Sequence, residues 1–203
     1  MTSDLEHKTQ QLIEAGRIID SNGWVPATSG NFSARLKNGN LLVTVSGKHK
    51  GRLTSDDFML VDPSGSPLEN KKPSAELGLH VSVYQRYPSV GAVLHPHTAG
   101  AILMSRLSPS TLILSGHELL KAFEGITTHE TSVMVPIFPN DQNIPRLAAS
   151  VEHFIESEGD IRAYIIANHG LYTWGSTVSD ALRHLEALEF MLQIETRLLG
   201  LTP

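Results

Sequence analysis

Cysteine is absent from the 203 residues, and no apolar run is long enough to cross a bilayer. Without cysteine the chain forms no disulfide and has no thiolate, so histidine and carboxylates must supply any metal ligands. Basic residues are also fewer than acidic ones, since the chain has 16 lysines and arginines and 21 aspartates and glutamates, which gives a formal net charge of −5. We therefore expect neither nucleic acid nor a membrane as a partner.

The composition is that of a globular protein, with 40% hydrophobic and 18% charged residues. The length suits one domain over residues 1–203. The polar, acidic N-terminus lacks the basic and then apolar order of a signal peptide, so we expect a cytoplasmic protein. Strand-like and helix-like segments mix without strict alternation. This pattern predicts an α/β fold of the α+β type, with a central, mainly antiparallel sheet flanked by helices.

The hydrophobic periodicity places these elements along the chain. Helices are expected at 3–22, 74–87, 98–106, 118–123, 144–156 and 179–199. Strands are expected at 31–36, 40–46, 58–61, 90–95, 112–114, 133–138, 163–167 and 171–174. Ser74 is placed to cap the second helix, with Glu76 in its first turn.

Two histidine clusters each follow an apolar segment that is typical of a buried strand. His95-Pro96-His97 ends one such segment, and Asn168-His169-Gly170 ends another. Alternate strand residues share a face, so His95 and His97 have Cα atoms roughly 6.5 Å apart and can bind one ion. A third imidazole from the other strand end would leave a metal position open for water or substrate, as in catalytic zinc sites. Zinc is the expected ion, although iron, manganese and cobalt also suit three nitrogens.

Three short segments combine small residues with hydroxyl groups at turns or helix starts. They are Thr28-Ser29-Gly30-Asn31, Ser46-Gly47-Lys48 and Pro73-Ser74-Ala75. Free backbone N–H groups and hydroxyls suit the oxygens of a phosphate group, and a helix N-terminus also favours an anion. Each segment alone is also typical of an ordinary turn or cap, so the phosphate hypothesis depends on the three occurring together.

Glu76 and Glu118 compete for the role of acid or base. A carboxylate beside a metal-bound ketone can remove an α-proton if burial brings its pKa near neutrality. Both glutamates also have an ordinary interpretation, as carboxylates favoured near the start of a helix. His80 lies one turn after Glu76 and is placed to orient it, but we favour a packing role for His80.

These motifs occur in the order and spacing of the class II aldolase/adducin family, which the chain resembles from about Leu5 to Leu199. The resemblance implies one zinc per subunit on His95, His97 and His169. It also implies that a small phosphorylated ketose is bound, and that the protein is a homotetramer with active sites at subunit interfaces. The residues implied to hold the phosphate are Gly30, Asn31, Ser46, Gly47, Ser74 and Ala75.

Within the family, three further segments resemble hydro-lyases of methionine salvage: 44–49, 116–121 and 169–175. This resemblance implies that Glu118 is the catalytic acid or base and leaves the role of Glu76 open. The aldolases of the family use a tyrosine near the C-terminus, and no tyrosine follows Tyr172 here. A dehydratase is therefore the expected function. A sugar-phosphate aldolase or epimerase is the alternative, and a non-catalytic adducin-like module is a further one.

Overall fold

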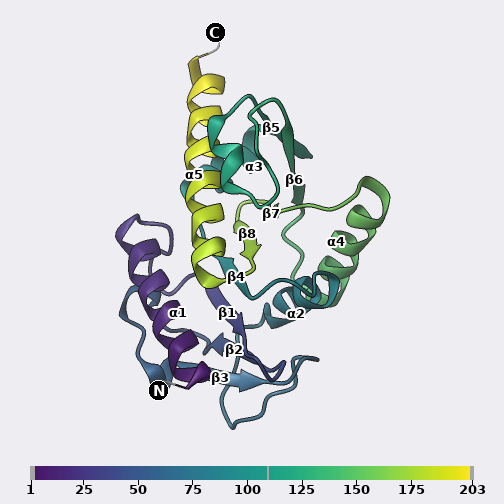
Figure 1. Ribbon diagram of the computed structural model, residues 1–203. Coiled ribbons are helices and arrows are strands. Elements are labelled where there is room, and N and C mark those ends of the chain that lie inside the picture. The colour runs from purple at the N-terminus through teal and green to yellow at the C-terminus, as the bar shows by residue number, and fades with distance from the viewer. Residues whose placement is uncertain (1–2, 109, 202–203) are drawn as a thin grey trace.

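One sheet of eight strands forms the centre of the fold, with the strand order β3-β2-β1-β4-β8-β7-β6-β5 (Figure 1). The computed structural model describes residues 3–108 and 110–201. All neighbouring strands are antiparallel except β6 and β7, which are parallel. The strands are β1 (Asn31–Arg35), β2 (Leu41–Thr44), β3 (Phe58–Val61), β4 (Ala92–His95), β5 (Thr111–Ser115), β6 (Ser132–Phe138), β7 (Ala163–Ile166) and β8 (Gly170–Gly175).

Helices cover both faces of this sheet. One hydrophobic cluster joins the sheet to α1 (Asp4–Ser21), α3 (Ala99–Leu107) and α5 (Val178–Leu201). A second cluster joins the opposite face to α2 (Leu77–Arg86) and α4 (Ile144–Glu158). Three short 3₁₀ helices complete the described elements: η1 (Lys50–Arg52), η2 (Ser55–Asp57) and η3 (Glu118–Ala122). The predicted fold class, a mainly antiparallel sheet flanked by helices, is confirmed.

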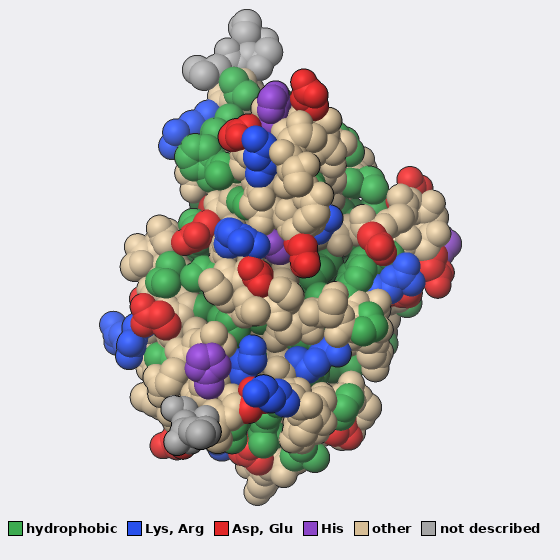
Figure 2. All heavy atoms as spheres, in the orientation of Figure 1, with side chains coloured by type: hydrophobic (Ala, Val, Ile, Leu, Met, Phe, Trp, Pro, Cys, Tyr) green, Lys and Arg blue, Asp and Glu red, His purple; other side chains and the backbone are tan. Residues whose placement is uncertain are grey.

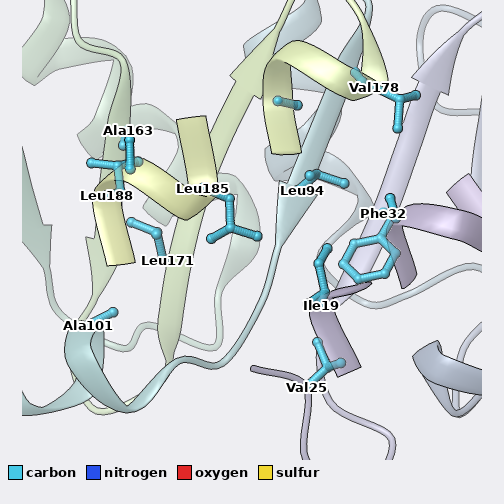
Figure 3. Close-up of a cluster of buried hydrophobic side chains, with 14 of the residues drawn as sticks. Ile19, Val25, Phe32, Leu94, Ala101, Ala163, Leu171, Val178, Leu185 and Leu188 are labelled. Carbon is cyan, nitrogen blue, oxygen red and sulfur yellow. The ribbon is translucent and has the colours of Figure 1, made fainter. Parts of the chain in front are cut away.

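The two clusters explain why the central strands are apolar throughout. Successive strand residues point to opposite faces. In β4, Leu94 therefore packs into the α5 cluster, whereas Val93 packs into the α2 cluster. Figure 3 shows Leu94 near Phe32 of β1, with Leu185 of α5 facing the same cluster. Because both faces are covered, the ends of the central strands are the places where polar side chains can gather.

One predicted helix start is wrong. The helix α2 begins at Leu77, and Glu76 occupies its N-cap position instead of lying in the first turn. Ser74 is not the cap, although its Oγ accepts a hydrogen bond of 3.3 Å from the backbone N–H of Glu76. Pro73 forms a β-bridge with Val45, and a turn closed by a hydrogen bond of 3.2 Å from the Leu77 N–H to the Ser74 carbonyl oxygen leads from there into the helix. The later start places Glu76 at the end of the helix that points toward β4.

The surface carries both signs of charge. On the face drawn in Figure 2, lysine and arginine side chains are interspersed with aspartates and glutamates. Among the helices that the structure describes, none is both long and apolar enough to span a membrane.

Candidate metal centre

The two histidine clusters meet because β4 and β8 are neighbours in the middle of the sheet (Figure 1). His95 is the last residue of β4, and His169 lies in the turn between β7 and β8. The backbone N–H of Leu171 donates to the Pro96 carbonyl oxygen at 3.0 Å, which fixes the two turns against each other. A Cβ on Gly170 would meet His95 Cε1 at 2.9 Å, so only glycine allows this close approach.

Four side chains converge at this place. Glu76, His95, His97 and His169 each offer a ligand atom, and these atoms all lie within 4.8 Å of one another. The Nε2 atoms of His95 and His97 are 3.1 Å apart. The Glu76 carboxylate lies between two imidazoles, with Oε2 at 3.4 Å from His95 Nε2 and Oε1 at 3.4 Å from His169 Nε2. The three predicted metal ligands are thus brought together, and a carboxylate joins them.

His95 is held in one tautomer. Its Nδ1 lies 3.0 Å from the Leu171 carbonyl oxygen, which can only accept, so Nδ1 carries the proton and donates. Nε2 therefore has a free lone pair and faces the cluster. The imidazole is fully buried, and this burial, followed by the neighbouring imidazoles of His97 and His169, holds the pKa of His95 well below its ordinary value. The side chain is neutral at neutral pH, as a metal ligand must be.

The other two imidazoles are more accessible. Burial, then His169 and Lys50, lowers the pKa of His97 to about 4. His169 Nδ1 lies 3.3 Å from Asn140 Oδ1, and this contact leaves Nε2 to face Glu76. Nitrogen lone pairs that face one another at 3.1 Å repel unless a cation or a proton lies between them. The chemistry of this donor set therefore fits a divalent metal, and the opening beside His97 leaves room for further ligands.

A cavity of about 170 Å³ adjoins the cluster at His97 and Glu76. Five of the six residues predicted to hold a phosphate line it: Gly30, Asn31, Ser46, Gly47 and Ser74. Gly30 has a φ of 75°, and a Cβ there would lie 2.5 Å from the His95 carbonyl oxygen. Ala75 is exposed and does not line the cavity.

Lys50 also lines this cavity, and the sequence reasoning missed it. The residue is only 2% exposed. Its Nζ donates to the carbonyl oxygens of Thr28, at 3.0 Å, and Lys48, at 2.6 Å, and so joins two loops around the cavity. Burial lowers the pKa of Lys50 to about 8. Lysine is rarely buried, so the residue type alone gave no signal.

Glu118 does not belong to the cluster. It begins η3, which packs on α5, and its side chain is 70% exposed. Its Oε1 accepts a hydrogen bond of 2.6 Å from Lys121 Nζ, and this contact is the main cause that lowers the pKa of Glu118. His129 lies 3.5 Å from the other carboxylate oxygen. Of the two predicted acid/base residues, the described chain therefore brings only Glu76 to the three histidines.

The chain belongs to the Class II Aldolase and Adducin N-terminal domain family, which matches residues 10–196. Methylthioribulose-1-phosphate dehydratase from Methylococcus capsulatus is 56% identical over 198 residues, which cover 98% of this chain and 97% of the relative. The protein of the same name from Pseudomonas aeruginosa strain PAO1 is 50% identical over the whole of both chains.

A solved structure shares the fold. The protein YgbL from Klebsiella pneumoniae superposes with a TM-score of 0.82 at 24% identity, over 100% of this chain and 94% of that one. At this identity the likeness concerns the arrangement of the sheet and helices.

Proposed function

We propose that this protein dehydrates 5-methylthioribulose 1-phosphate to 5-methylthio-2,3-dioxopentyl 1-phosphate, a step of methionine salvage, and is thus a hydro-lyase. The observation that carries this proposal is the full-length identity of 56% to a dehydratase of that name. The cluster of three imidazoles and a carboxylate beside a cavity supports it. The expected cytoplasmic location is consistent with this function and remains a prediction.

We propose His95, His97 and His169 as the ligands of one zinc ion per subunit. A zinc ion bound there would act as a Lewis acid on the carbonyl and hydroxyl oxygens of the ketose. His95 contributes a lone pair of fixed direction because the Leu171 carbonyl holds its tautomer. Glu76 lies against His95 and His169, where its carboxylate can hold a proton on the Oε1 side that Asn31 does not contact.

The cavity suits the phosphate group of the substrate. Ser46 and Ser74 offer hydroxyls, Gly30 and Gly47 allow close approach of the backbone, and Lys50 adds a positive charge. The predicted roles of Asn31 and Ala75 are less direct, because the Asn31 amide is engaged with protein partners and Ala75 lies outside the cavity. We retain both as candidates through their backbone.

Dehydration removes the C3 proton and the C4 hydroxyl, and the resulting enol then gives the 2,3-diketone. A base must take the C3 proton, and an acid must protonate the leaving hydroxyl. We propose Glu118 for this proton transfer and Glu76 as a second carboxylate beside the metal. Because Glu118 is exposed and lies outside the cluster, we propose that it acts on the site of a neighbouring copy in a homotetramer.

Product analysis tests the function directly. The purified, zinc-loaded protein is incubated with 5-methylthioribulose 1-phosphate, and the products are identified by mass spectrometry. The proposal predicts a product lighter by the mass of one water molecule. Cleavage to a smaller phosphate would indicate an aldolase, and an isomer of unchanged mass would indicate an epimerase. Either result, or no turnover, would overturn the proposal.

A further inference from the structure

A buried polar seam runs from the metal cluster into the interface between β1 and α2. Glu76, His80 and Tyr84 recur every four residues along α2, whereas Asn31 and Ser33 alternate along β1. Four helical residues span about 6.0 Å along the helix axis, and two strand residues span about 6.6 Å along the strand, so the polar side chains have nearly the same spacing on both elements. This match lets each polar side chain of the helix meet one of the strand.

Every link of the seam is a hydrogen bond. Asn31 Nδ2 donates to Glu76 Oε2 at 2.9 Å, and His80 Nε2 contacts Asn31 Oδ1. Ser33 Oγ lies 2.7 Å from His80 Nδ1 and 2.9 Å from the Tyr84 hydroxyl oxygen. Asn31, Ser33, His80 and Tyr84 are all buried, at 6% exposure or less.

The Glu76 carboxylate sets the direction of the whole seam. A carboxylate only accepts, so the Asn31 amide must turn its NH₂ group toward Glu76 and its oxygen toward His80. His80 must then donate from Nε2, which leaves Nδ1 to accept from Ser33. The Ser33 oxygen in turn accepts from Tyr84. Burial lowers the pKa of His80 to about 3, so its imidazole is neutral and has one proton for this purpose.

We propose that His80, through Asn31, is a positioning residue that holds the Glu76 carboxylate against the metal ligands. This inference rests on the proposed function for its catalytic consequence, but its geometric content does not depend on the substrate. An amide does not pass a proton from its oxygen to its nitrogen in ordinary exchange. The seam therefore fixes the orientation of Glu76 and carries no proton to it. The packing role expected for His80 is thus incomplete, since both of its nitrogens are hydrogen-bonded.

The same hydrogen bonds oppose a 180° rotation of the Asn31 side-chain amide. Rotation by 180° would bring its oxygen against the Glu76 carboxylate and its NH₂ group against a donating His80. Without His80 as a donor, only the contact with Glu76 opposes this rotation, so the amide and the carboxylate that it holds are less firmly fixed. Loss of such an indirect contact typically weakens metal binding or activity by about 10- to 100-fold.

The test compares His80→Phe and Ser33→Ala with the matched control His184→Phe. His184 is also a buried histidine, and its Nδ1 donates to the Trp174 carbonyl oxygen at 2.6 Å, on the α5 side of the sheet. Each protein is loaded with Co²⁺, and its visible absorption spectrum and its Co²⁺ affinity are measured. The activity on the phosphorylated ketose is then measured on fully loaded protein. Ser33→Ala serves if His80→Phe does not fold, because it removes only one oxygen.

For His80→Phe, the proposal predicts an altered Co²⁺ spectrum and a Co²⁺ affinity lower than that of the wild type by about 10-fold or more. Ser33→Ala should show a smaller change in the same direction. His184→Phe should show no spectral change. It also predicts that kcat falls more than KM rises. Wild-type spectra and affinities in both seam variants would overturn it, and so would an equal change in the control. An inactive wild-type protein would overturn the proposed function alone, because the spectra still test the seam.

Discussion

Replacement of Lys50 by methionine should change how the stability of the protein depends on pH. Lys50 is 2% exposed, and burial lowers its pKa from 10.5 to about 8. This fall corresponds to roughly 3 kcal/mol by which the folded state disfavours the charged side chain. Below pH 8 the lysine is charged in both states, so the wild-type protein carries this full cost. Between pH 8 and 10.5 the unfolded state binds more protons, and stability rises with pH.

The wild-type protein should therefore gain roughly 2 kcal/mol in the free energy of unfolding, relative to Lys50→Met, between about pH 7.5 and 10. Methionine has a similar length and no charge, but it leaves the Thr28 and Lys48 carbonyl oxygens without their donor. That loss costs about 1–3 kcal/mol at every pH, so it shifts the whole curve without changing its slope.

Urea unfolding, followed by circular dichroism on chelator-treated protein at one fixed concentration, measures this difference. Lys48→Met is the matched control, because Lys48 lies two residues before Lys50 and its side chain is 47% exposed. The control should follow the wild-type pH dependence. A gap between wild type and Lys50→Met that stays constant over this pH range would refute the argument that Lys50 carries a desolvated charge.

Three further substitutions test the site and the core. Glu118→Gln should keep zinc and the melting temperature but lower dehydration by about 10²- to 10⁴-fold, and near-normal turnover would remove Glu118 from the reaction. Gly170→Ala should weaken zinc binding by about 10-fold or more, because the new Cβ would meet His95 Cε1 at 2.9 Å and His97 Cδ2 at 3.0 Å. Competition with a chelating dye measures the zinc affinity, and an unchanged affinity would contradict the packing of these turns. Leu94→Ala should lower the free energy of unfolding by about 2–5 kcal/mol, because Leu94 is fully buried. If urea unfolding shows that this free energy falls by less than about 1 kcal/mol, the core tolerates the cavity.

The sequence predicted the sheet and the place of the histidines because both depend on local patterns. An apolar run followed by His-Pro-His or Asn-His-Gly marks a buried strand and its end, whatever the rest of the chain does. The adjacency of β4 and β8 then brings the two ends together. The predicted start of α2 is too early because Ser74 to Leu77 form a turn before the helix, and hydrophobic periodicity does not distinguish such a turn from the first helical turn.

The remaining parts of the site depend on contacts between distant segments. Lys50 is buried because two loop carbonyls converge on its Nζ, and nothing in its neighbours along the chain indicates this. The position of His80 one turn after Glu76 suggests an orienting role. The hydrogen bonds that would give it this role come from Asn31 and Ser33 of β1, which are distant in the sequence. Glu118 lies outside the cluster in one copy, and its proposed action on a neighbouring copy is a matter that neither a local pattern nor the fold of one chain decides.

Anomalous diffraction from zinc-loaded crystals, recorded on both sides of the zinc absorption edge, tests the metal centre most directly. We expect one strong peak per chain, about 2.0–2.1 Å from Nε2 of each of His95, His97 and His169. An anomalous peak beside other residues, or the absence of a peak among these three imidazoles in zinc-loaded protein, would contradict the proposed metal centre.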